Sequence, residues 1–137
     1  QEKWRGNITS ELFHNVKWDL LSDLELFMKE YMDHITPDFV RLSIGLRAPQ
    51  IYQETAPFIM KVPNAFLSAM IEYLKGMKQR GKLPNLDYEC LAMTIFSSTF
   101  GFTFLSASFE NGLTHITKDE FIKQTAATLI EGIPHFK

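Results

Sequence analysis

The segment from Cys90 to Phe109 constrains this chain more than any other part of its sequence. It reads CLAMTIFSSTFGFTFLSASF, twenty residues with five phenylalanines and no charge. As a helix with about 100° per residue, it carries two apolar stripes on almost opposite sides, separated by small or hydroxyl residues. The first stripe is Met93, Phe96, Phe100 and Phe104, and the second is Leu91, Ile95, Phe102, Leu105 and Phe109. The chain's own core can cover one stripe, so the other predicts a surface for a partner helix.

The same segment allows two other interpretations. Its length suits a transmembrane helix, but seven of the twenty residues are Ser or Thr, and Asp87, Glu89 and Glu110 flank it where a membrane span favours cationic and aromatic residues. We therefore expect no membrane partner. A core helix wrapped on all sides by its own chain remains the alternative to a core helix that also carries a subunit interface.

The composition indicates one intracellular domain. A chain of 137 residues is large enough to bury about two thirds of its unfolded surface. Cys90 is the only cysteine, so no internal disulfide can form, and we expect a buried thiol in a cytoplasmic protein. The net charge of −2 excludes a broadly basic surface of the kind that holds nucleic acid. Because the chain starts with Gln, we expect it to be a fragment of a longer protein.

Helix start and stop signals are frequent and strand signals are nearly absent, which predicts an all-α fold of about six helices. Asp87 is the expected N-cap of the uncharged helix, Thr117 and Glu120 form a capping box, and Gly81 suits a left-handed C-terminal cap. Prolines at 49, 57 and 63 predict short helical pieces and loops over 47–62. The expected longer elements are 9–17, 19–34, 36–46, 63–81, 90–109 and 117–133.

No catalytic or metal site is recognisable. The histidines at 14, 34, 115 and 135 have no ligand spacing, and neither a phosphate-binding loop nor a nucleophile motif occurs, so we expect no enzyme, no metal and no cofactor. The acidic residues of the first long helix are assigned to its solvent face. They are Asp19, Asp23, Glu25 and Glu30.

A cluster of basic residues surrounds Gly81 at the end of the helix expected over 63–81. It is assigned to the favourable interaction of cations with a helix C-terminus, in preference to nucleic-acid binding. Its members are Lys75, Lys78, Arg80 and Lys82.

Four short motifs carry a resemblance to a known family. They are YLKGMKQRG at Tyr73–Gly81, the acidic helix start Leu86–Glu89, SSTFGF at Ser97–Phe102, and TLIEGI at Thr128–Ile133. In this order they resemble the C-terminal domains of tetracycline-repressor-like (TetR-family) transcriptional regulators. The resemblance covers mainly residues 65–134 and fits 19–62 more loosely.

Membership of that family would imply an effector-binding and dimerisation domain. The last two long helices of each subunit would form a four-helix bundle in a homodimer, and a cavity among the preceding helices would take a small inducer. DNA would be bound only through an N-terminal helix-turn-helix domain that this chain does not contain. A helical protein–protein adaptor and an enzyme with an unrecognised site remain as alternative functions.

The two stripes give the candidate site residues. If the first stripe faces inward, it meets the apolar faces of the helices at 19–34 and 63–81, and the cavity favours an apolar or aromatic molecule. The candidate ligand-binding residues are Phe27, Met28, Tyr31, Met32, Phe66, Met70, Met93, Phe96, Thr99, Phe100, Thr103 and Phe104. The candidate dimer-interface residues are Leu91, Ile95, Ser98, Phe102, Leu105, Phe109, Ile122, Thr125 and Leu129.

Overall fold

The computed structural model describes residues 15–34, 37–46 and 48–133, and over these ranges it contains six helices and no strand. The all-α helical bundle expected from the sequence is confirmed. Residues 9–14 of the helix expected over 9–17 lie outside the described residues, and the described residues 16 and 17 are not helical. The helices are α3 (Leu20–His34), α4 (Pro37–Gly45), α5 (Tyr52–Ile59), α6 (Lys61–Gln79), α7 (Tyr88–Ser108) and α8 (Lys118–Glu131).

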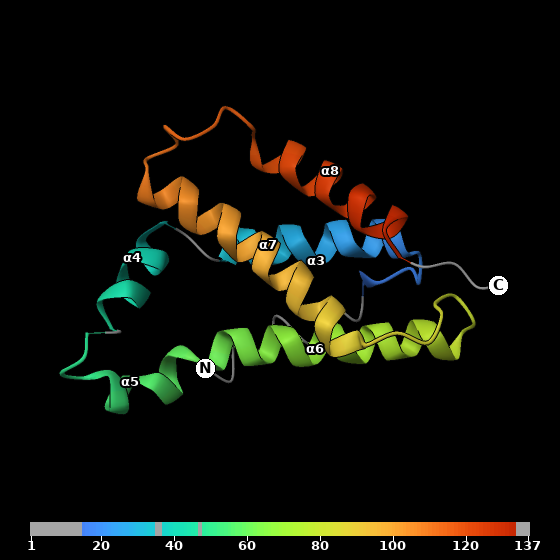
Figure 1. Cartoon of the computed structure of the whole chain (residues 1–137), viewed down its shortest axis with the longest axis horizontal. Helices are drawn as coiled ribbons and strands as arrows, with labels where there is room; N and C mark the ends of the chain where they lie inside the picture. The colour runs from blue at the N-terminus through green and yellow to red at the C-terminus, as the bar shows by residue number, and fades with distance from the viewer. Residues whose placement is uncertain (1–14, 35–36, 47, 134–137) are drawn as a thin grey trace.

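Helices α3 and α6 run antiparallel, α7 crosses both of them, and α8 lies along α3 (Figure 1). Helices α4 and α5 occupy the end of the molecule where α3 finishes and α6 starts. This arrangement makes α7 the central helix, because it packs against α3, α4 and α6.

The predicted caps are confirmed. The Asp87 carboxylate accepts a hydrogen bond of 2.9 Å from the backbone N–H of Cys90, and Thr117 and Glu120 form the complete capping box of α8. Gly81 has φ +74°, the left-handed conformation that lets the chain turn from α6 toward α7. These boundaries are local, so the sequence alone determines them.

The segment 47–62 is more helical than its prolines indicated. Pro57 lies inside α5, where a short helix forfeits one internal hydrogen bond. Pro63 lies in the first turn of α6, where its missing N–H would have had no partner within the helix. Helix α6 consequently begins at Lys61, two residues earlier than expected.

Tyr73 of α6 joins the N-terminal half of α3 to the core. Its ring lies edge-on to Phe27 at 4.9 Å, and its hydroxyl donates a 2.5 Å hydrogen bond to Asp23. The other carboxylate oxygen of Asp23 accepts from the backbone N–H of Lys17 at 2.9 Å. Burial, together with the hydrogen bond to Asp23, raises the pKa of Tyr73 well above its ordinary value, so its hydroxyl keeps the proton that it donates.

The expectation that Asp23 faces solvent is wrong. The residue is 1% exposed. Asp23 is buried because other parts of the chain cover it and supply hydrogen-bond donors. The backbone N–H of Lys17, before α3, is one donor, and the hydroxyl of Tyr73 in α6 is the other. Periodicity along one helix cannot reveal two partners that come from elsewhere in the chain.

Replacing Tyr73 with Phe should test this buried pair. The Y73F variant keeps the ring and deletes one donor to a buried carboxylate, so we expect the free energy of unfolding to fall by about 1–3 kcal/mol in chemical denaturation. Tyr52 is 46% exposed, and Y52F should change stability by no more than about 0.5 kcal/mol. Equal stabilities of Y73F and the parent protein would contradict the assignment.

Candidate functional site

Helix α7 is buried along a line that lies between its two apolar stripes. Its buried residues are Tyr88, Ala92, Ile95 and Thr99, spaced four, three and four apart. Ala92 and Thr99 are small, so neighbouring helices approach the α7 backbone closely, and the Thr99 hydroxyl is satisfied by donating to the carbonyl of Ile95 at 2.7 Å. The two stripes therefore lie on either side of this buried line, and neither stripe as a whole faces the core.

Two residues differ from the expected orientation as a result. Ile95 was expected to face a partner and is fully buried in this chain's own core, whereas Met93 was expected to face inward and is 42% exposed. Cys90, the expected buried thiol, is also exposed. A rotation of α7 by about half the angle between its stripes accounts for all three.

The predicted ligand-binding residues of α3, α6 and α7 come together as a packed aromatic core. Tyr31 lies 4.8 Å from Phe66 and 5.3 Å from Phe96 between ring centroids, and the Phe66–Phe96 distance is 5.7 Å. Phe100 and Phe104 continue the row along α7 at spacings of 6.0 and 6.1 Å. Occupancy of this region by a ligand stays a prediction. The fully or nearly buried members of the predicted set are Phe27, Met28, Tyr31, Met32, Phe66, Met70 and Thr99.

The outer face of α7 carries no charge between Cys90 and Ser108. It presents exposed small and hydroxyl residues beside two large apolar side chains, and a methyl group built at Gly101 would meet nothing within 4 Å. We call this surface the α7 face. Its exposed residues are Cys90, Met93, Thr94, Ser97, Leu105 and Ser108.

The predicted interface residues fall into three groups. Leu105 and Phe109 are 42% and 55% exposed, as a partner surface requires. Ile95 and Ile122 are buried within the chain. The rest are half-buried, and one of them, Phe102, stacks on Phe121 of α8 at 4.3 Å. These half-buried residues are Leu91, Ser98, Phe102, Thr125 and Leu129.

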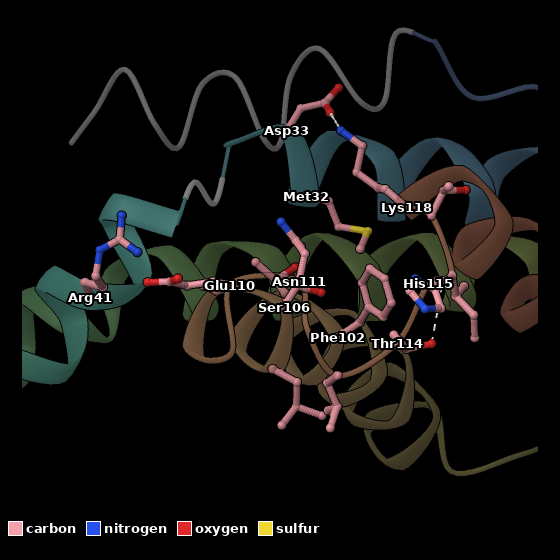
Figure 2. A pocket seen from close by; sticks show the side chains of 16 residues that line it. Met32, Asp33, Arg41, Phe102, Ser106, Glu110, Asn111, Thr114, His115 and Lys118 are labelled. Atoms are coloured by element: carbon pink, nitrogen blue, oxygen red, sulfur yellow. Dashed lines mark hydrogen bonds and ion pairs between the residues drawn. The ribbon is translucent and has the colours of Figure 1, made fainter.

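A cleft of about 860 Å³ lies where the C-terminal end of α7 meets the ends of α3 and α8. The segment 109–117, which links α7 to α8, forms one wall, and α4 contributes Arg41. Figure 2 shows Met32 of α3 and Phe102 of α7 pointing toward one another in its centre. The apolar lining is completed by Leu105, Leu113 and Ile116, the last two 56% and 52% exposed.

Hydroxyl groups and one amide line the middle of the cleft, and charged side chains lie at its ends. Thr103, Ser106, Asn111 and Thr114 line it. Arg41 and Glu110 lie at one end, and His115 and Lys118 lie at the other (Figure 2). The formal charges of the lining residues balance, which favours a neutral molecule over a phosphate or another anion.

Asp33 connects this cleft to the fold. Its carboxylate accepts hydrogen bonds from Lys118 of α8 at 2.5 Å and from Lys29 at 3.1 Å. Partial burial pushes the pKa of Asp33 upward, but the two lysines outweigh it and hold that pKa below its ordinary value of 3.8. The ion pair with Lys118 joins the start of α8 to the end of α3 beside the cleft.

Sequence reasoning found only part of this cleft. Of its lining, Met32 and Thr103 were predicted to bind a ligand, and Phe102 and Leu105 were predicted to bind a partner. The segment 110–118 was missed because it has no helical periodicity. The isolated apolar residues Leu113 and Ile116, placed between two capped helices, were the only available signal.

Three residues of the basic cluster around Gly81 contact other parts of this chain. The Arg80 guanidinium lies 3.4 Å from the centre of the Trp18 ring, Lys82 donates to the Trp18 carbonyl, and Lys78 donates to Asn85 at 2.9 Å. These contacts support the assignment of the cluster to the end of α6. No group of three potential metal ligands occurs among the described residues.

Helix α7 is long and apolar enough to cross a membrane by length and composition. Its mean hydropathy is 1.5 over eighteen residues, and core helices of soluble proteins pass the same test.

Comparisons with protein-family models, curated proteins and solved structures give no significant match to this chain.

The Asp33 interaction predicts an acid-sensitive contribution to stability. Because the folded-state pKa is depressed, the contribution is present above the unfolded pKa and is lost as the pH falls through the folded value. We expect the difference in Tm between the parent protein and D33N to be constant from about pH 7 to 5 and to shrink below about pH 4.

Asp38 offers a matched control, because its side chain is 91% exposed and it pairs with Arg41 of its own helix. D38N should stay close to the parent protein throughout this range. A difference between the parent and D33N that is as large at pH 3 as at pH 7 would contradict the role given to Asp33.

Proposed function

We propose that this chain is the effector-binding and dimerisation domain of a TetR-like transcriptional regulator. The observation that carries the proposal is the uncharged α7 face, which is exposed along the whole helix while the same helix also forms the centre of the fold. A helix that serves both purposes is expected where the penultimate helix of one subunit packs against a second copy.

The small residues of the α7 face support close helix packing. Met93, Leu105 and Phe109 are the large apolar side chains exposed on α7 and at its C-cap, and two copies would bring six of them together. Burying them completely contributes on the order of 6–9 kcal/mol to the free energy of dimerisation. This gain is about as large as the entropic cost of association and leaves no surplus. A stable dimer therefore also needs close backbone contact at Ser97 and Gly101, and additional surface from α8.

The cleft at the end of α7 supports effector binding. Its volume of about 860 Å³ lies in the range of small-molecule sites, and it combines an apolar centre with a few hydroxyl and amide groups. We infer that the effector is a neutral apolar or aromatic molecule, oriented by one or two hydrogen bonds to groups such as Thr103 or Ser106. The cleft replaces the aromatic core as the favoured location, because the rings of that core already contact one another.

The same proposal includes where the domain acts, what it lacks and how it would reach DNA. The domain acts in the cytoplasm without catalysis, metal or cofactor. It contacts DNA only through an N-terminal domain outside this chain, because the basic residues at the end of α6 are engaged with Trp18 and Asn85.

Charge placed on the α7 face should separate the subunits. We expect the parent chain to sediment at about twice the monomer mass at micromolar concentration. S97E should sediment as a monomer with unchanged helical circular dichroism, because Ser97 is exposed and a buried unpaired charge at a dimer interface is strongly unfavourable. Q79E adds the same charge at an exposed position of α6 and should remain dimeric. A monomeric parent chain would contradict dimerisation.

A panel of neutral hydrophobic compounds should reveal the effector site. A compound present at about a hundred times its dissociation constant should stabilise the folded state by about 2.7 kcal/mol, measured as a rise in thermal midpoint. L113N should lose this response, whereas L21N should keep it, because Leu21 is also partly exposed, at 42%, but lies outside the cleft. A response that L113N retains would place the ligand elsewhere, and no response to any neutral compound would contradict effector binding.

A further inference from the structure

Trp18 attaches the described part of the segment before α3 to the far end of α6. The Trp18 ring stacks on Tyr73 with centroids 5.3 Å apart and planes 12° from parallel. The Arg80 guanidinium covers the Trp18 ring at 3.4 Å, a cation–π contact. The Lys82 ammonium donates a 2.5 Å hydrogen bond to the Trp18 carbonyl. Three residues of α6 and the turn that follows it therefore hold one tryptophan.

Gly76 makes this attachment possible. A Cβ at position 76 would lie 2.9 and 3.0 Å from two atoms of the Trp18 ring, closer than real contacts allow. The glycine is an unfavourable choice inside a long helix, where alanine is preferred. Its presence at this turn of α6 is explained by the ring that lies against it.

Trp18 also adopts a backbone conformation that bulky residues avoid. Its φ is +58°, in the left-handed region. The side-chain contacts with α6 hold the backbone there, since the described segment 16–19 has no regular secondary structure of its own. The ring is only half-buried, so these contacts form at the edge of the molecule.

The attachment lies at one end of the junction between α3 and α6. Asp23–Tyr73, Phe27–Tyr73 and Tyr31–Phe66 bridge the two antiparallel helices at successive turns, and Trp18 with Gly76 comes next in the same series. Unlike the other bridges, it belongs to the chain before α3. Displacing Trp18 would uncover one face of Tyr73 while the interior bridges remain.

We propose that Trp18 forms a latch that closes reversibly on α6. In the closed state its ring lies against Tyr73 and Gly76. In the open state the ring leaves α6, while the hydrogen bonds of Asp23 to Lys17 and Tyr73 and the packing of the helices remain. The latch is independent of the effector and of dimerisation, because none of its contacts involves the cleft or the α7 face.

Tryptophan fluorescence of the full chain can follow the latch directly. Trp4 lies outside the described residues and is replaced by Phe, which leaves Trp18 as the only tryptophan. In the W4F parent we expect Trp18 to become accessible to iodide at a lower denaturant concentration than that at which the helical circular dichroism is lost. Coincident transitions would overturn the proposal, since Trp18 would then be an ordinary part of the core.

A pair of glycine substitutions tests the contact with α6. In the W4F background, G76A should shift Trp18 emission to longer wavelength and raise its iodide quenching constant at least two-fold, with unchanged helical signal. G45A makes the same change at a helical position of α4 with nothing within 4 Å and should leave Trp18 emission as in the parent. Unchanged Trp18 emission in a folded G76A would overturn the latch.

A second pair keeps the test decisive if G76A does not fold. R80M removes the guanidinium that covers Trp18 and should lower the denaturant midpoint of the Trp18 signal without lowering that of the helices. K78M removes a cation from the same end of α6 that bonds Asn85 and does not touch Trp18, and it should leave both midpoints unchanged. Equal shifts of both midpoints in R80M would show that Trp18 and the helices unfold as one unit, and would overturn the proposal.

Discussion

The buried hydrogen bond between Tyr73 and Asp23 is the constraint on which most of this fold depends. It brings a carboxylate into the core, and a buried carboxylate is tolerated only where donors meet it. One donor comes from α6 and the other from the backbone of Lys17, so the interaction fixes two segments against α3 at once. The same tyrosine ring contacts Phe27 on one side and Trp18 on another. Removing it would disconnect three parts of the chain.

With α3 and α6 fixed, the orientation of α7 follows from side-chain size. The helix turns its smallest buried residues, Ala92 and Thr99, toward its neighbours, and this brings its backbone close to theirs. Its phenylalanines then fall to both sides, Phe96 toward Tyr31 and Phe66, and Phe102 toward α8. What remains outward is uncharged. The proposed dimer surface is thus a consequence of how the monomer packs, together with a sequence that places no charge on this helix after Glu89.

The cleft at the end of α7 has a different origin. It lies between the end of α7, the nine non-helical residues that join α7 to α8, and the ends of α3 and α8, which the Lys118–Asp33 ion pair connects. The aromatic residues that the sequence predicts as a ligand site contact one another, with ring centroids 4.8–6.1 Å apart. The more adaptable volume lies where loop and helix ends meet, which is also where hydroxyl and amide groups gather.

The sequence by itself determined the all-α class, the N-caps of α7 and α8 and the turn after α6, because Asp87, Thr117 and Gly81 act within one or two turns of the chain. It did not determine the helices around Pro57 and Pro63, which lie inside α5 and α6. It also predicts that α7 needs cover on more than one side, since the twenty residues from Cys90 to Phe109 carry no charge. Only the tertiary structure decided that Asp23 is buried, that Met93 faces outward and Ile95 inward, and that a cleft forms beside residues 109–117. Each of these depends on partners distant in sequence, and the rotation of a helix about its axis is set by what packs against it.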